Sequence, residues 1–363
     1  MAILFCYLIY FFLILRFCVT LFNFISNPKL TKVSHQYHDL VSILIPARDE
    51  ERNILTLLQS IKNQNYKNIE VIILDDHSSD QTYQLCADFA LNNAAFKIIS
   101  GKPLPSGWLG KNFACYQLAQ QAIGKYLLFL DADEEIDDDL INSSIYRIKV
   151  HRLALLSLFT NQVMVTLGEK LVVPLMHYML LNLLPLRLIY LSTNPAFAAA
   201  SGQFMFFDAE QYRKHQWHQK VKNQVVEDVE IMKCVKQEKL KGEGLLANGL
   251  IRCRMYNNYK EAIYGFSKNF LAPFNYSVIM FLFYVVFIIG GPILIGLTLP
   301  LQLSLMMISL IVLTRVMISL SSGQNPFYNI LLHPLQMISL VIVAHLAVKK
   351  YLTKTTTWKG RKV

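Results

Sequence analysis

The chain has 363 residues, of which 53% are hydrophobic and 17% are charged, and its mean hydropathy is +0.34. This composition is too apolar for an ordinary soluble enzyme, and a charged middle region argues against a simple transporter. The formal net charge of +10 raises nucleic acid as a partner. No nucleic-acid-binding motif accompanies that charge, and basic residues beside membrane segments explain it better. We therefore expect membrane lipids, and no nucleic acid, among the partners.

The first segment is a predicted membrane anchor. Ala2–Phe24 is apolar apart from Arg16 and is long enough to span a bilayer. It has no basic start and no small-residue cleavage site, which favours an uncleaved anchor over residues 1–26 rather than a signal peptide. Lys29 and Lys32 follow it and no basic residue precedes it, so the next domain should face the cytoplasm.

The middle of the chain, residues 27–277, alternates predicted strands with predicted helices. The expected strands are Val41–Ile45, Ile69–Leu74, Phe96–Ile99 and Tyr126–Leu130, and the expected helices are Glu51–Lys62, Gln81–Leu91 and Asn112–Ile123. Because the strands are almost continuously apolar, this alternation predicts an α/β domain whose mostly parallel sheet is covered on both faces.

Two of these strands end in acidic residues. The second runs into Asp75 and Asp76, and the fourth runs into Asp131 and Asp133. Ligands of such sheets bind beyond the carboxyl ends of the strands, and paired carboxylates there suit Mg²⁺ or Mn²⁺. An Asp-rich turn explains either pair alone nearly as well. Together the two acidic strand ends predict a crevice for a nucleotide and a metal.

Residues 170–191 are apolar enough to be taken for a membrane span, but they cannot cross once. A single crossing would place Asp133 and Asp228 on opposite sides of the bilayer. Pro174 and Pro185 also interrupt the segment, which carries an arginine that costs roughly 2.5–3.5 kcal/mol at mid-bilayer. We predict short helices in the membrane interface that help to bring a lipid acceptor to the crevice.

The apolar character returns in residues 278–348. Three candidate spans follow each other there, Val278–Leu299, Leu301–Leu320 and Ile330–Val348. Three crossings from a cytoplasmic domain would leave the basic tail, residues 349–363, outside, although basic flanks prefer the cytoplasm. The third segment therefore crosses, lies in the interface or re-enters the membrane, and the sequence leaves all three open.

Four segments in the middle region resemble the motifs of family 2 glycosyltransferases. They are Ile45–Glu51, Leu74–Thr82, Leu130–Asp133 and Val226–Asp228. Three others resemble a membrane-bound branch associated with carotenoid, hopanoid and other lipid glycosylation, namely Gly107–Asn112, Arg254–Tyr256 and Gly265–Asn269. The resemblance implies a GT-A fold, here inserted between N-terminal and C-terminal transmembrane helices, and inversion at the sugar carbon.

The resemblance also implies roles for single residues. Donor-binding residues would be Pro46, Glu50, Asp76, Lys111 and Asp131. A divalent cation, Mg²⁺ or Mn²⁺, would lie at Asp133 with Asp131, and Asp228 would be the general base. Three of these residues have a plainer alternative, because Glu50 and Asp228 also fit the acidic first turn of a helix, and Lys111 fits a solvated helix start.

The acceptor region departs from that branch. A Gly-Gly-His turn is common in that branch before the Glu-Asp pair, whereas this chain has Gln216, Trp217 and His218. The identity of the acceptor therefore cannot be inferred from the resemblance. Trp217 would either stack on a sugar or prenyl chain or simply pack. We also assign Glu227 and Arg254 to this region. The Gln-x-x-Arg-Trp signature of processive synthases is absent, which favours transfer of a single sugar.

The expected function is thus a membrane-bound inverting glycosyltransferase at the bacterial cytoplasmic membrane, with its catalytic domain in the cytoplasm. It would move one hexose from a nucleoside-diphosphate sugar, such as a UDP-sugar, to a lipid acceptor such as a carotenoid or other isoprenoid. Two alternatives stay open. The acceptor could be a polyprenyl phosphate or diacylglycerol, or the domain could be degenerate and bind only nucleotide or partners.

Overall fold

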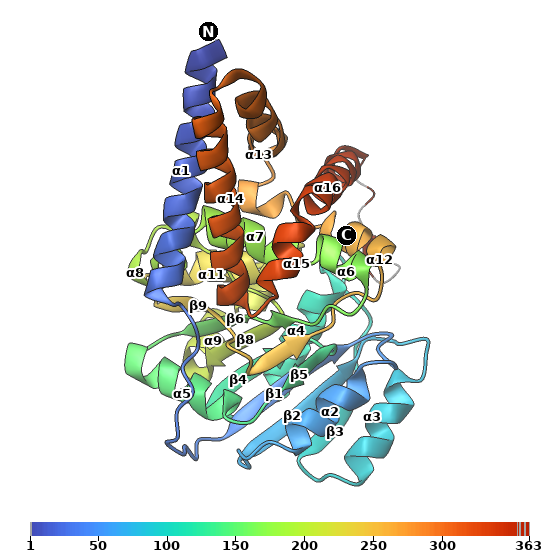
Figure 1. Cartoon of the computed structure of the whole chain (residues 1–363). Helices are drawn as coiled ribbons and strands as arrows, with labels where there is room; N and C mark the ends of the chain where they lie inside the picture. The colour runs from blue at the N-terminus through green and yellow to red at the C-terminus, as the bar shows by residue number, and fades with distance from the viewer. Residues whose placement is uncertain (1, 354, 356, 359–360, 363) are drawn as a thin grey trace.

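A computed structural model describes the chain apart from residues 1, 354, 356, 359–360 and 363. An α/β domain built on a central sheet forms one end of the molecule, and long helices from both ends of the chain extend from one side of it (Figure 1). The prediction of an α/β domain between N-terminal and C-terminal apolar helices is therefore confirmed. Lys354 and Lys359 of the basic tail lie outside the described residues.

The central sheet has seven strands in the order β3-β2-β1-β4-β8-β6-β9. Their bounds are β1 Val41–Ala47, β2 Ile69–Asp75, β3 Phe96–Ser100, β4 Tyr126–Leu130, β6 Leu155–Phe159, β8 Phe204–Asp208 and β9 Gly242–Leu246. Only β8 runs antiparallel to its neighbours within this sheet, so the sheet is mostly parallel, as predicted. A smaller sheet has the order β5-β10-β7, with β5 Glu134–Ile136, β7 Asn161–Gln162 and β10 Ile251–Cys253. A short pair, β11 Thr357–Trp358 and β12 Arg361–Lys362, lies near the end of the chain.

Helices cover both faces of the central sheet. The helices of the α/β domain are α2 Ile54–Lys62, α3 Thr82–Leu91, α4 Gly110–Gln121, α5 Leu140–His151, α9 Ala209–His215, α10 Trp217–Lys220, α11 Glu227–Gln237 and α12 Tyr259–Phe266, with 3-10 turns at Pro195–Phe197 and Ala272–Phe274. Alternate residues of β1 enter different cores, since Leu44 belongs to one cluster and Ile43 and Ile45 to the other. The near-continuous apolar strands follow from this burial on both sides.

Four helices are long and apolar enough to cross a membrane. They are α1 Ala2–Ser26, α13 Val278–Thr298, α14 Leu301–Ser322 and α16 His333–Thr353, with the short α15 Pro326–Leu331 between the last two. The N-terminal part of α1 lies beside the turn between α13 and α14, where Cys6 Sγ is 3.2 Å from Thr298 Oγ1. These three helices extend away from the sheet together (Figure 1).

Helix α16 is tied to the α/β domain near both of its ends. Close to its start, Gln336 Nε2 donates to the Lys170 carbonyl at 2.9 Å in α6, Leu167–Val172. Close to its end, Lys350 Nζ donates to Ser267 Oγ at 2.6 Å, directly after α12. Because both ends lie against the same domain, this arrangement favours the interfacial alternative for α16.

Residues 170–191 form short helices, as predicted, and the breaks between these helices lie at the two prolines. α6 is followed by α7 Pro174–Leu183 and α8 Arg187–Leu191. Pro174 begins α7, where a missing N–H costs nothing. Helix α7 packs against α1, and Asn23 Nδ2 donates to the carbonyls of Leu181 at 2.9 Å and Leu184 at 2.8 Å. The segment is thus joined to the anchor helix.

Candidate functional site

The residues assigned to the donor lie at the carboxyl ends of neighbouring strands. Pro46 lies in β1 beside Leu74 of β2, Glu50 follows β1, and Asp76 directly follows β2. Asp76 is only 7% exposed, and its backbone carbonyl accepts a hydrogen bond from Arg48 Nη1 at 2.6 Å. The strand order therefore brings these three positions to one edge of the sheet.

Lys111 joins two acidic residues that come from distant parts of the chain. Its Nζ lies 2.7 Å from Asp131 Oδ1 and 3.2 Å from Glu227 Oε1. Burial acts to lower the pKa of Lys111, but the two carboxylates outweigh it and hold that pKa well above its ordinary value. Lys111 is thus a charged part of the site and not a solvated lysine at a helix start.

Asp228 points its carboxylate into the same group of side chains. Helix α11 begins at Glu227, so both acids occupy its first turn. Asp228 Oδ2 accepts the backbone N–H of Gly202 at 2.7 Å, and Oδ1 accepts that of Val229 at 2.8 Å. Loss of hydration, and then the Glu227 carboxylate, raise the pKa of Asp228 to about 7. Such a carboxylate can accept a proton near neutral pH.

Gly202, just before β8, lies at the centre of this cluster and was not predicted. A Cβ at this position would come 3.1 Å from Lys111 Nζ and 3.2 Å from Glu227 Oε1. Its N–H also holds Asp228, so the backbone here both leaves room for the charged groups and orients one of them. No motif in the sequence marks this glycine, because its neighbours come from elsewhere in the chain.

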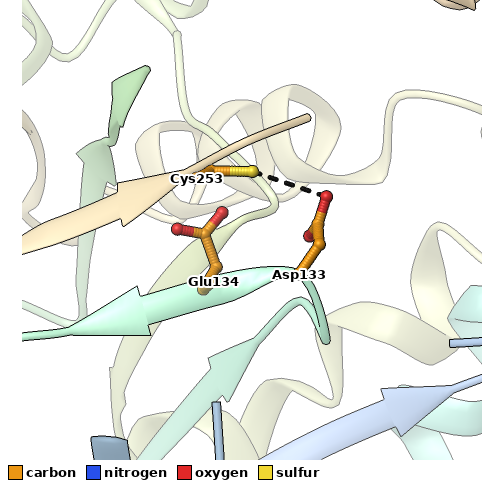
Figure 2. Close-up of side chains that lie close together, drawn as sticks. All are labelled: Asp133, Glu134 and Cys253. Carbon is orange, nitrogen blue, oxygen red and sulfur yellow. Dashed lines mark hydrogen bonds between the residues drawn. The ribbon is translucent and has the colours of Figure 1, made fainter. Parts of the chain in front are cut away.

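Asp133 forms a second cluster with two residues from the smaller sheet. Figure 2 shows Asp133 and Glu134 at the start of β5, and Cys253 facing them from β10. The Cys253 thiol donates to Asp133 Oδ2 at 3.4 Å, and the possible ligand atoms of all three residues lie within 4.8 Å of one another. Burial first, and then neighbouring carboxylates including Asp131, raise the pKa of Asp133.

The second cluster fits a divalent cation. Glu134 is 1% exposed, and within the described part of the chain neither of its carboxylate oxygens has a hydrogen-bond partner. Burial, together with Asp133 and Asp131, raises the pKa of Glu134 well above its ordinary value. A cation would remove this penalty, since buried carboxylates are stabilised by pairing or by metal. The Asp131 carboxylate, which we assigned to both donor and metal, is held by Lys111 in this structure.

Sequence reasoning missed Glu134 and Cys253 as members of this cluster. A signal for Glu134 was present, because Ile136 is buried and lies two residues further along the same strand, on the same face. Cys253 gave no such signal. It meets Glu134 only through the antiparallel register of β10 with β5, which joins segments more than a hundred residues apart.

Two residues assigned to the acceptor region lie in the core. Trp217 is 0% exposed, stacks on Phe207 and donates through Nε1 to Glu238 Oε2 at 2.9 Å. His218 is 1% exposed, and its Nδ1 lies 2.7 Å from the Tyr212 hydroxyl. Burial lowers the pKa of His218 to about 3, so the ring is neutral. The structure thus shows the packing alternative for Trp217.

Arg254, the remaining residue of that region, is bound to α6. Its Nη2 lies 2.9 Å from Oε1 of Glu169, which is fully buried. Glu169 also accepts a hydrogen bond from Thr166, the residue that caps α6. Arg254 therefore connects the strand that carries Cys253 to the start of the segment beside the anchor.

Comparison with known proteins shows what the domain resembles. Residues 42–215 match the family model "Glycosyl transferase family 2". Two curated relatives are 4,4'-diaponeurosporenoate glycosyltransferases, one from Staphylococcus haemolyticus, 32% identical over 99 residues, and one from Staphylococcus aureus, 34% identical over 103 residues. These matches cover 27% and 28% of this chain and only about a quarter of each relative, 25% and 26%.

A solved structure shares the fold over almost the whole chain. It is a mannosyltransferase from Pyrobaculum calidifontis in complex with GDP-Man and Mn²⁺, with a TM-score of 0.57 and 12% sequence identity. The likeness covers 93% of this chain and 95% of that one, and confirms the predicted GT-A fold. Residues 42–215 are thus similar to family 2 glycosyltransferases, and the solved structure shows the fold alone.

Proposed function

We propose that this chain is a membrane-bound inverting glycosyltransferase, which moves one hexose from a nucleoside-diphosphate sugar, such as a UDP-sugar, to a lipid acceptor. The observation that carries the proposal is the group formed by Lys111, Asp131, Glu227 and Asp228. This group connects two parts of the site. One part is the strand ends, which are expected to bind the donor, and the other is Asp228, whose carboxylate can take a proton. A degenerate domain would have no physical need for this arrangement of buried charges.

Each residue has a distinct task in the proposed reaction. Pro46, Glu50 and Asp76 would hold the nucleoside, because carboxylates accept hydrogen bonds from base N–H and ribose hydroxyl groups. A divalent cation held by Asp133 and Glu134 would supply positive charge to the departing diphosphate.

Asp228 would take the proton from the acceptor hydroxyl while that oxygen attacks the sugar carbon. The carbon–oxygen bond to the diphosphate breaks in the same displacement, so the configuration inverts. Lys111 would hold Asp131 and Glu227 in place and offset their negative charge beside Asp228. The two curated relatives are named for a carotenoid acceptor, which supports testing carotenoids and other isoprenoid lipids first.

We further propose that the α/β domain lies on the cytoplasmic face of the bacterial membrane. Three crossings by α1, α13 and α14 would place the domain and the end of the chain on the same side, with α16 in the interface. This arrangement reconciles the basic tail with the preference of basic flanks for the cytoplasm.

The test is transfer by the purified full-length protein. Radiolabelled UDP-, GDP- and dTDP-sugars would be offered with Mg²⁺ or Mn²⁺ and total membrane lipid, and the labelled lipid identified by mass spectrometry. We expect a metal-dependent product that disappears in Asp133→Ala and persists in Asp88→Asn, a change in an exposed acid of α3. Absence of both turnover and metal-dependent nucleotide binding would overturn the proposal.

A further inference from the structure

A polar pocket lies where the membrane-side helices meet the smaller sheet. Its volume is about 380 Å³, within the range of about 300–1,000 Å³ that small-molecule sites occupy. The pocket is partly open, and its polar lining residues are Lys29, Asn161, Gln162, Asn248, Arg252 and Ser321. It has room for a ligand much larger than a water molecule, and none of the residues with a task in the proposed reaction lines it.

The pocket lies at the domain-side ends of two apolar helices. Lys29 follows the end of α1 at Ser26, and Ser321 lies in the last turn of α14, which ends at Ser322. Figure 1 shows both helices extending from the domain in the same direction. In the membrane placement proposed above, both helices leave the hydrocarbon at this level, so the pocket lies at the depth of the lipid head groups.

Asn161 ties together three of the segments that form the pocket. From β7, its Nδ2 donates to the Ser322 carbonyl at 3.0 Å, and its Oδ1 accepts the Gly249 N–H at 2.6 Å in the turn before β10. In the same turn, Asn248 Nδ2 donates to the Leu30 carbonyl at 3.0 Å, in the segment after α1. The walls are therefore fixed before a ligand binds, which lowers the entropic cost of binding.

The pocket carries positive charge, and in the described part of the chain no acidic residue lines it. Lys29 Nζ donates to the Leu320 carbonyl at 3.3 Å, and among the described residues it forms no ion pair with a carboxylate. Arg252 contacts the Asp137 carboxylate through Nη2, and its Nε lies 3.9 Å from Glu135 Oε2. This Nε is buried and donates no hydrogen bond within the part of the chain that the structure describes. Lys29 thus has charge, and Arg252 a donor, to offer to an anion.

Gln162 adds an acceptor to these donors. It is 8% exposed, and its Nε2 donates to Thr160 Oγ1 at 2.8 Å, whereas its buried Oε1 accepts no hydrogen bond from the described residues. A buried acceptor without a partner is costly, so a ligand hydroxyl beside Gln162 would be favourable. A phosphoglycerol head supplies both a phosphate for the donors and hydroxyls for this acceptor. A choline head has no hydroxyl and adds a positive charge.

The pocket and the metal cluster lie on opposite faces of the smaller sheet. In the register of β10 with β5, Cys253 pairs with Glu134 and Arg252 pairs with Glu135. Because successive side chains of a strand point to opposite faces, Arg252 points away from the cluster drawn in Figure 2. A lipid bound beside Arg252 is therefore not placed to attack the sugar, and its role differs from that of the acceptor.

We propose that this pocket binds the phosphoglycerol head of an anionic membrane lipid. The phosphate would contact Lys29 and Arg252, as in other basic pockets beside cytoplasmic helix ends, and a glycerol hydroxyl would donate to Gln162. The acyl chains would lie in the bilayer beside Leu320, which is 49% exposed. The proposal rests on the membrane placement given above, but it needs neither a sugar donor nor a transfer reaction.

Binding is measured by thermal unfolding of the delipidated full-length protein in a neutral detergent without donor, so that failure here leaves the transfer test unaffected. The additions are phosphatidylglycerol, phosphatidylcholine, soluble glycerol 3-phosphate and phosphatidylmethanol, which keeps the charged phosphate but has no hydroxyl. We expect phosphatidylglycerol to raise the Tm at the lowest concentration. Equal stabilisation by phosphatidylcholine overturns the charge argument, by phosphatidylmethanol the hydroxyl argument, and by glycerol 3-phosphate the lipid argument.

Variants locate the binding to this pocket. Lys29→Gln should weaken the apparent affinity for phosphatidylglycerol at least about tenfold, because it removes a hydrogen bond from a charged donor. Lys29→Arg keeps the charge and should retain the affinity. The control Lys32→Gln removes an exposed positive charge from the same segment but outside the pocket, and should bind as the wild type does. Unchanged affinity in Lys29→Gln, or an equal loss in Lys32→Gln, overturns the proposal.

Discussion

Replacing Asp228 by asparagine tests the central step of the proposed reaction. A positioned general base contributes about 100- to 10,000-fold to a rate, so kcat for a hydroxyl acceptor should fall within that range. The donor KM should change little, because the expected donor contacts lie at other residues. With the pKa of Asp228 raised to about 7, the wild-type rate should rise with pH up to about 7 as the carboxyl loses its proton, and then level off.

The structure also gives the cost of this substitution for stability. Both oxygens of Asp228 accept backbone N–H groups, from Gly202 at 2.7 Å and Val229 at 2.8 Å. An asparagine offers one oxygen and one donor, so one N–H loses its acceptor, at a cost of about 1–3 kcal/mol. Relief of the repulsion from Glu227 acts in the opposite direction. We therefore expect a folded protein with a Tm a few degrees lower.

The assay compares single-turnover transfer at saturating donor for wild type, Asp228→Asn and the exposed-acid control Asp88→Asn, with the Tm of each. A folded Asp228→Asn protein that retains more than about one-third of the wild-type rate would refute the role of Asp228 as base. That result would point to an acceptor that attacks as an anion, such as a phosphate or carboxylate, which needs no base.

Three further predictions concern the charges and the topology. Lys111→Met should reduce transfer and lower the Tm more at pH 8 than at pH 5, because Asp228, with its pKa raised to about 7, carries the charge that Lys111 offsets at pH 8 and is protonated at pH 5; an equal loss at both values would contradict this electrostatic role. Mn²⁺ should raise the Tm at pH 8 and do so less at pH 5.5, since the raised pKa of Asp133 leaves it protonated there, and Asp133→Ala should abolish the effect; a pH-independent shift would argue against this site. A single cysteine added after α16 should react with a membrane-impermeant reagent only when the side carrying the α/β domain is exposed, and labelling from the opposite side would show that α16 crosses.

Local sequence pattern was sufficient to predict most of the domain. Strand β4 has the bounds expected from its apolar run, Tyr126–Leu130, because both of its faces are covered. Helix α2 begins at Ile54 rather than Glu51, since the chain first makes a turn after Asp49, whose φ is +52°. Such helix starts depend on backbone conformations that periodicity does not reveal.

The site was predictable only in part, for a different reason. Strand ends identified Asp76, Asp131 and Asp133 because parallel topology fixes where strands finish. The partnership of Lys111 with Glu227 depends on how α4 and α11 approach each other, and no local pattern encodes that distance. Trp217 shows the same limit, since its stacking on Phe207 and its bond to Glu238 exist only once the core has formed.

The link between the anchor and the sheet has a consequence for how the protein meets its acceptor. Directly after α1, the Leu30 N–H donates to the Leu246 carbonyl at 3.0 Å, and the Leu246 N–H donates to the Pro28 carbonyl at 2.9 Å. The segment directly after the anchor therefore pairs with the edge strand β9, which fixes the anchor to the sheet. In the membrane orientation proposed above, the crevice would be held at a fixed height and tilt above the lipid surface, and the proposed lipid acceptor would reach it by lateral diffusion. Turnover would then follow the acceptor's density in the membrane plane and not its bulk concentration.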